Sequence, residues 1–182
     1  MSISDENLIK AVRHGDQNAL EQLVRRWYPR IYAYILRMIG KETDAYDVTQ
    51  ETFLSMVKAI ENYKLWGKFQ SWIFTIAHNK CMDFFRMHGV VNTSIEHLDE
   101  EKAHEKTYDE IGIEAMIINT LAVENALKRL SVMQRDAIVL YYFNGFNLWQ
   151  IAQMTNTPLT TIKSRMSAAK KLLANYLKEE LG

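Results

Sequence analysis

The chain has 182 residues, of which 48% are hydrophobic and 24% charged, a balance typical of a folded globular protein with one ordinary domain or two small ones. It contains no run of about 18 uninterrupted apolar residues, and residues 1–6 lack a basic segment followed by an apolar one, so we expect a cytoplasmic chain without membrane insertion. The single cysteine, Cys81, excludes an internal disulfide, and its apolar neighbours favour a core residue over a nucleophile.

The net charge of zero conceals an uneven distribution. Residues 1–90 carry 12 basic and 10 acidic side chains, residues 91–120 carry 2 and 8, and residues 121–182 carry 8 and 4. Between 157 and 178 there are five basic residues and no acidic one. An acidic middle segment therefore masks a basic C-terminal end, which is the charge that a nucleic-acid-binding segment needs.

The sequence predicts an all-α protein, because it has two prolines, seven glycines and no sustained two-residue alternation. A first helix is expected over residues 4–14, where Ser4 is a good N-cap and Gly15 suits the position after a helix. A second should run from residue 16 or 18 to 40, with Pro29 as a kink.

A third helix is expected over about 44–61 and a fourth over about 70–88, which together with the first two would make one compact domain, residues 1–88. The third should bury Ala45, Val48, Thr52, Phe53, Met56 and Ile60. The fourth should bury Trp72, Ile73, Ile76, Ala77 and Phe84.

After residue 88 the helical period fails, and we interpret 89–117 as an acidic linker to a second helical domain, 118–182. A solvated spacer is the plainer interpretation of the same segment. Within the second domain, Ser131 and Gln134 have the spacing of a capping box, and so do Asn147 and Gln150. Thr157 as N-cap and Pro158 as first helical residue should begin the last helix, which would bury Ile162, Met166, Ala169, Leu173 and Tyr176.

A short helix, a turn of about four residues and a longer capped helix have the spacing of a helix-turn-helix motif, whose second helix enters the major groove. Opposite the apolar stripe of that helix lie Thr160, Lys163, Ser164 and Ser167, with Arg165, Lys170 and Lys171 nearby. Hydroxyl and amine donors can contact base edges, and the cations can contact phosphates. An amphipathic helix with a solvated basic face is the alternative.

Several of these segments resemble extracytoplasmic-function sigma factors, bacterial transcription initiation subunits, and the resemblance covers nearly the whole chain. Residues 44–53 (DAYDVTQETF) are similar to the family's polymerase-binding helix, and residues 69–79 (FQSWIFTIAHN) to its promoter-melting helix. Residues 126–130, 134–135, 151–152 and 161–165 are similar to its −35-binding domain. The resemblance implies a sigma region 2-like bundle over 1–88 and a sigma region 4-like helix-turn-helix over 118–182.

The resemblance also implies partners and contact residues. Core RNA polymerase would bind Asp47, Gln50 and Glu51, which belong to a polar stripe with Lys58 and Glu61 that an ordinary solvated face would also explain. The −10 element would meet Tyr63, Lys64, Trp66, Lys68 and Asn79; of these, Trp66 fits a core lid equally well. The −35 element would meet Thr160, Thr161, Lys163, Ser164, Arg165, Ser167, Lys170 and Lys171. An anti-sigma factor would be a further partner.

The chain departs from the family pattern at four positions. Many members have an acidic residue in place of Tyr46, a glycine in place of Thr160, and arginines in place of Ala168 and Lys170. Since Ala168 lies on the expected groove side and supplies no donor, the usual −35 contacts are altered here.

The sequence carries no signature of a metal site or of an enzyme. His97 and His104 show no metal-ligand spacing, and no phosphate loop, dinucleotide turn or nucleophile set occurs, so we expect no metal, no cofactor and no catalytic residue. A dimeric helix-turn-helix regulator and a protein-binding helical adaptor remain as alternatives. A regulator would bind duplex DNA alone, an adaptor would bind none, and a sigma factor would need core polymerase.

Overall fold

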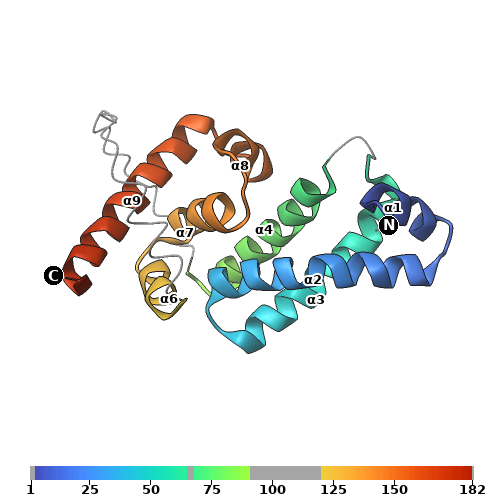
Figure 1. The fold of residues 1–182 in the computed structure, drawn as a ribbon, viewed down its shortest axis with the longest axis horizontal. Helices are drawn as coiled ribbons and strands as arrows, with labels where there is room; N and C mark the ends of the chain where they lie inside the picture. Colours follow the sequence, from blue (N-terminus) through green and yellow to red (C-terminus); the bar gives the residue numbers. More distant parts are fainter. Residues whose placement is uncertain (1–2, 65–67, 91–119, 182) are drawn as a thin grey trace. The chain divides into compact units, whose positions relative to one another are not determined.

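The computed structural model describes residues 3–64, 68–90 and 120–181, with the side chains of 120–123 and 177–181 left aside. The chain divides into two compact units, Met1–His88 and Gly89–Gly182. The secondary structure of the described residues is helical in both units (Figure 1), which confirms the predicted all-α class. Most of the predicted linker, residues 91–117, lies outside the described ranges.

The helices of the first unit are α1 (Asp5–Arg13), α2 (Gln17–Ile39), α3 (Glu42–Ala59), the 3₁₀ turn η1 (Ile60–Asn62) and α4 (Phe69–Met87). Side-chain caps and a glycine determine where two of these helices begin or end. The Ser4 hydroxyl accepts a hydrogen bond from the amide of Asn7, and the Asp16 carboxylate accepts one from Ala19. Gly40 ends α2 in the left-handed conformation at φ 78°, which a residue without Cβ adopts at little cost.

The core of the first unit joins α2, α3 and α4, and α1 packs against α2. Tyr34 of α2 and Phe74 of α4 are fully buried with ring centroids 5.4 Å apart. All six residues predicted to face inward from the third helix are buried, and so is Cys81. Pro29 lies within α2, which is assigned as one continuous helix, and its side chain is exposed.

The buried stripe of α4 differs from the predicted one. Ile73 and Ala77 are buried as expected, but Trp72, Ile76 and Phe84 are only half-buried. The face of α4 that packs against the core is turned about the helix axis relative to the predicted face. The other residues that it buries are Phe69, Phe74, Cys81, Met82 and Phe85. Because apolar residues occupy more than one stripe of this helix, its period alone did not select the face that packs.

The described helices of the second unit are α6 (Thr120–Lys128), α7 (Val132–Ile138), the π-helical turn η2 (Val139–Phe143), α8 (Leu148–Met154) and α9 (Leu159–Leu181). Both predicted capping boxes are present, at Ser131 with Gln134 and at Asn147 with Gln150. The five residues predicted to form the buried face of the last helix are all buried. The amphipathic period therefore located this helix and its face correctly.

The turn between α8 and α9 is a Schellman motif. Asn156 has φ 47°, the Thr157 amide donates to the Ala152 carbonyl at 3.0 Å, and the Asn156 amide donates to Gln153 at 3.4 Å. Thr157 was predicted to cap α9, and this was wrong: its hydroxyl donates to the Thr155 carbonyl at 3.1 Å. The helix begins one residue later than expected because its first carbonyl acceptor is that of Pro158, bonded to the Ile162 amide at 3.1 Å.

The helices in the described ranges include none whose length and hydrophobicity would let it span a lipid bilayer.

The packing of α3 generates a stability prediction. Met56 is fully buried, and a truncation to alanine leaves a cavity, so Met56→Ala should lower the free energy of unfolding by about 2–5 kcal/mol. Its sequence neighbour Val57 is 39% exposed, and Val57→Ala should cost about 0.5 kcal/mol or less. The measurement is urea unfolding followed by tryptophan fluorescence in a Trp149→Phe background, where the remaining tryptophans all lie in the first unit. Equal losses for the two variants would contradict the assigned face of α3.

Candidate partner and nucleic-acid interfaces

Three predicted contact residues lie together on the outer face of α3. Asp47, Gln50 and Glu51 are all exposed and are spaced three and four residues apart, which places them on one side of the helix. The opposite side carries the buried residues Val48, Thr49 and Thr52. Glu51 also lies 3.7 Å from the Lys80 ammonium of α4, so this acidic surface reaches the neighbouring helix.

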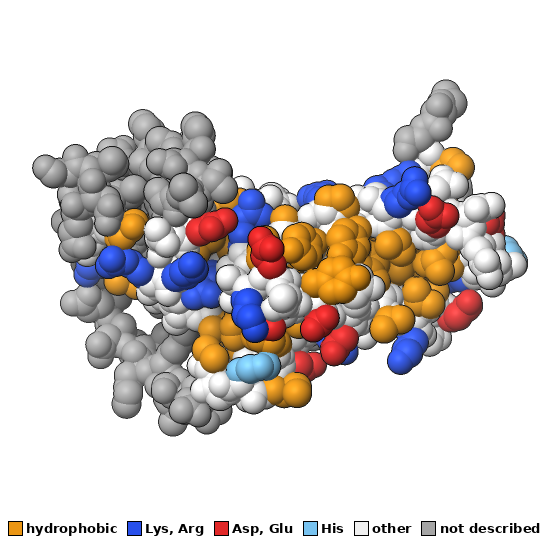
Figure 2. Space-filling model, turned by 90° about the horizontal axis from the view of Figure 1, so that it is seen from below, with side chains coloured by type: hydrophobic (Ala, Val, Ile, Leu, Met, Phe, Trp, Pro, Cys, Tyr) orange, Lys and Arg blue, Asp and Glu red, His pale blue; other side chains and the backbone are white. Residues whose placement is uncertain are grey.

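The same face carries apolar side chains that sequence reasoning did not assign to it. Tyr46 is 53% exposed, Leu54 60% and Val57 39%. Figure 2 shows apolar side chains gathered over α2 and α3, with acidic side chains at their margin. Large apolar groups exposed side by side are typical of a protein-binding surface. The sequence contains a sign of this surface, because these apolar residues lie outside the stripe of α3 that was predicted to be buried.

Tyrosines of α2 adjoin this face. The ring of Tyr28 stacks on Tyr32 at 6.0 Å and on Phe53 at 5.7 Å between centroids. Burial raises the pKa of the Tyr28 phenol, the nearby phenol of Tyr46 raises it further, and a hydrogen bond with Gln50 opposes both effects. The contact surface is therefore a mixed one, with aromatic and aliphatic groups beside carboxylates.

A cluster of aromatic rings surrounds the start of α4. Tyr63 lies 4.7 Å from Trp72 and 5.7 Å from Phe69 between ring centroids, and Phe69 lies 5.7 Å from Trp27 of α2. Tyr63 is only 7% exposed and Phe69 only 5%, whereas Trp72 is half-buried. These ring contacts connect α2, the start of α4 and the residue that follows η1.

The residues predicted to meet the −10 element do not all share one environment. Lys64, Lys68 and Asn79 are exposed, Tyr63 is enclosed in the aromatic cluster, and Trp66 lies outside the described residues. Along α4, half-buried Trp72 and exposed Asn79 lie seven residues apart on the same side of the helix, with half-buried Ile76 between them. Sequence reasoning had placed Trp72 and Ile76 in the core and so missed this face.

The outer face of α9 brings together most of the residues predicted to meet the −35 element. Thr160, Lys163, Ser164, Ser167 and Lys171 are exposed and recur at intervals of three and four residues. Ala168 is exposed on the same side. The helix therefore presents two amines and three hydroxyls to solvent along one stripe.

Three other residues predicted for the same element are less accessible. Thr161, Arg165 and Lys170 are half-buried. The Lys170 ammonium lies 5.8 Å from the centroid of the Tyr142 ring, which belongs to η2. Lys170 thus contacts a ring of its own unit. The exposed stripe of α9 consists of Thr160, Lys163, Ser164, Ser167, Ala168 and Lys171.

One exposed aromatic side chain in the second unit was not predicted. Trp149, at the start of α8, is 62% exposed. Among the described residues no group of three His, Cys, Asp or Glu side chains is placed to hold a metal ion, and His97 and His104 lie outside them.

Comparisons with known proteins match both units. The family described as sigma-70 region 2 matches residues 23–90, and the family described as sigma-70, region 4 matches residues 120–173. The chain is 27% identical over 190 residues to the ECF RNA polymerase sigma factor SigW of Bacillus subtilis, covering 98% of this chain and 100% of that protein. It is 30% identical over 177 residues to the RNA polymerase sigma factor NccH of Alcaligenes xylosoxydans xylosoxydans, covering 95% and 94%.

A solved structure resembles the chain as well. It is the sigma factor RpoE of Bartonella quintana in complex with the anti-sigma factor NepR, with a TM-score of 0.64 and 26% identity, covering 87% of this chain and 96% of that one.

Proposed function

The chain belongs to the extracytoplasmic-function sigma factors of the sigma-70 family, which bind core RNA polymerase and direct promoter-specific transcription initiation, and from this membership we propose which of its surfaces make each contact. The outer face of α3 binds core polymerase. The start of α4 and the segment before it meet the −10 element. The outer face of α9 meets the −35 element.

The observation that carries the first assignment is the composition of the α3 face. Asp47, Gln50 and Glu51 are exposed beside Tyr46 and Leu54, which are 53% and 60% exposed. Apolar anchors with polar groups at the rim are the usual anatomy of a protein interface. By analogy with the family, the partner is the coiled-coil clamp of the polymerase's largest catalytic subunit.

The second assignment concerns the start of α4. Exposed Lys64 and Lys68 supply positive charge for the DNA backbone, and the partly exposed ring of Trp72 supplies a stacking surface for an unpaired base. Asn79, two turns further along the same side of α4, adds an amide that can pair with a base edge. Tyr63 is buried behind this face and supports Trp72, 4.7 Å away between ring centroids.

The third assignment follows from the exposed stripe of α9. Lys163, Ser164 and Ser167 offer donors within the first two and a half turns of the helix, where the second helix of this motif contacts base edges. Lys171 lies a turn further on, and we assign it to a phosphate.

Further partners and the site of action follow from the same membership. A relative of this fold has been captured with an anti-sigma factor, and we propose that this chain is also restrained by one. We place its action in the cytoplasm, with the polymerase, and propose that it supplies binding and promoter recognition while the polymerase supplies the catalysis.

Charge reversal on α3 tests the polymerase contact. Asp47→Lys and Glu51→Lys should each weaken the affinity for core polymerase by about tenfold, because each puts a cation where the proposed interface has an exposed carboxylate. Glu21→Lys is the matched control, since Glu21 is an exposed acid that pairs with Arg25 within α2. The readout is a fluorescence titration of each variant with core polymerase at two salt concentrations.

The α3 assignment fails if both variants bind core polymerase as tightly as the unmodified chain. It fails equally if Glu21→Lys weakens binding as much as they do, since the effect would then reflect net charge.

Two lysines of α9 should separate base reading from phosphate binding. Lys163→Ala should relax the base preference at one −35 position, because a good bidentate contact to a base edge contributes about 1–3 kcal/mol. Lys171→Ala should weaken binding on every sequence and lower the salt slope by about one unit. Transcription from a promoter library at two salt concentrations distinguishes them.

Lys128→Ala is the control, because Lys128 is an exposed lysine of α6. If Lys163→Ala keeps the −35 preference of the unmodified chain and behaves like Lys171→Ala, then Lys163 is a phosphate contact and the hydroxyls or the DNA shape carry the specificity.

A further inference from the structure

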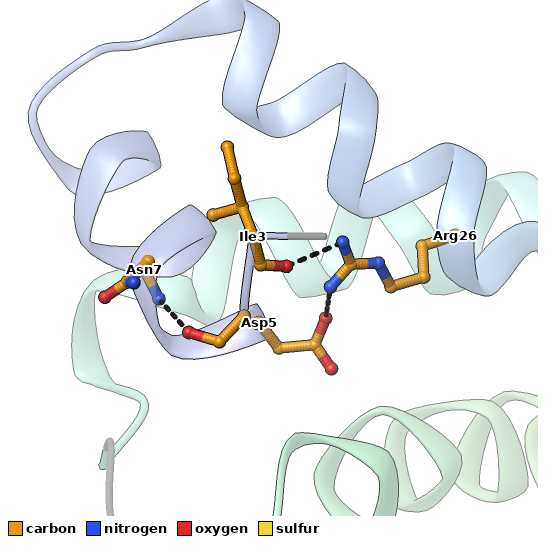
Figure 3. A network of polar contacts seen from close by, with 5 residues as sticks. Ile3, Asp5, Asn7 and Arg26 are labelled. Atoms are coloured by element: carbon orange, nitrogen blue, oxygen red, sulfur yellow. Dashed lines mark hydrogen bonds and ion pairs between the residues drawn. The ribbon is translucent and has the colours of Figure 1, made fainter. Parts of the chain in front are cut away.

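The first helix, α1, precedes residue 23, where the match to sigma-70 region 2 begins. Its N-terminal end is hydrogen-bonded to α2. The Arg26 guanidinium of α2 donates to the Asp5 carboxylate at 2.6 Å and to the Ile3 carbonyl at 2.7 Å (Figure 3). The Ser4 hydroxyl accepts a hydrogen bond from the Asn7 amide at the same end. Charge-assisted bonds of this kind fix the start of α1 against α2.

At its other end, α1 reaches the segment that precedes α4. Arg13, in the last turn of α1, donates to the Ile60 carbonyl through Nε at 3.0 Å and through one terminal nitrogen at 2.8 Å. The same terminal nitrogen donates to the Tyr63 carbonyl. These partners are 47 and 50 residues away along the chain, so α1 joins α2 to the backbone of η1 and the residue that follows it.

The chemistry of these contacts suits a guanidinium. The two carbonyls lie at the start of η1 and just after its end, and the backbone at Tyr63 turns to an extended conformation at φ −66°, ψ 129°. A planar fork with several donors can satisfy both carbonyls at once, whereas an amine has no such fixed geometry. Arg13 therefore fixes the backbone at the point where the chain leaves η1.

The side chain of Tyr63 is enclosed by rings of α4. Its ring packs on Phe69 and Trp72, and it is 7% exposed. Burial raises the pKa of its phenol, and the carboxylates of Glu6 and Asp5 raise it further. The Arg13 guanidinium lowers the pKa of the same phenol, so charged groups at both ends of α1 act on Tyr63 electrostatically.

We propose that Arg13 is a positioning residue for −10 recognition: it holds the backbone of residues 60–63 so that the rings around Tyr63 and the adjacent Lys64 are set in place before an unpaired base arrives. The inference rests on the proposed −10 surface. A preorganised site loses less free energy on binding than one that must first order its backbone. Arg13 itself need not contact DNA for this effect.

The test uses the holoenzyme formed from the full chain and core polymerase. The probes are single-stranded oligonucleotides randomised over the −10 element, and duplexes that carry only the −35 element selected by the unmodified holoenzyme. Arg13→Ala should weaken oligonucleotide binding by about tenfold and flatten the −10 base preference, with affinity for the −35 duplex and for core polymerase unchanged. Arg13→Lys should be intermediate. Arg25→Ala is the control, because the Arg25 side chain is 80% exposed and pairs with Glu21 of its own helix.

The proposal is overturned if the folded variants keep the oligonucleotide affinity and base preference of the unmodified chain while only their melting temperature falls, because Arg13 would then be purely structural. If Arg13→Ala does not fold, Arg13→Lys decides by the same criterion. An unmodified holoenzyme that selects no −10 sequence would overturn the proposed −10 surface itself, and the inference with it.

Discussion

Each long helix of this protein must bury one apolar stripe, and that constraint decides where its partners can bind. In the first unit, Val48, Thr52 and Met56 hold α3 against its neighbours, which leaves Asp47 and Glu51 on the outside. In the second unit the same rule buries one side of α9 and exposes its basic side. The proposed contact surfaces are therefore the helix faces that the two cores leave exposed.

Polar interactions at helix ends then place these surfaces accurately. The Schellman turn at Asn156 sets the start of α9, and the capping box at Asn147 sets the start of α8. In the first unit, Arg13 performs the corresponding task over a long sequence separation by binding the carbonyls at the end of the α3–η1 segment. Each proposed contact surface is therefore held in place by polar contacts within its own unit.

Much of this arrangement could be predicted from the sequence, because it depends on local chemistry. Caps, glycine stops and the 3.6-residue period gave the helices and the buried face of α9. Features that depend on tertiary packing could not be predicted: the enclosure of Tyr63 requires two rings of α4, and the partial exposure of Trp72 depends on which face of α4 packs against the core. The contacts of Arg13 follow no sequence period. The predicted start of α9 was one residue early because the first helical acceptor is the Pro158 carbonyl, and the Thr157 hydroxyl bonds to the Thr155 carbonyl instead of capping the helix.

The most direct test of the central claim is run-off transcription with purified core polymerase on a library of genomic fragments, with and without this chain. We expect discrete start sites that appear only when both are present, each preceded by a common −10 and −35 pair. The chain alone should protect no duplex, because the two proposed DNA-binding surfaces lie on separate units and we expect polymerase to be needed for both to meet one promoter. Sequence-specific protection of duplex DNA by the chain alone, with no new start site when polymerase is added, would contradict the account and favour a helix-turn-helix regulator.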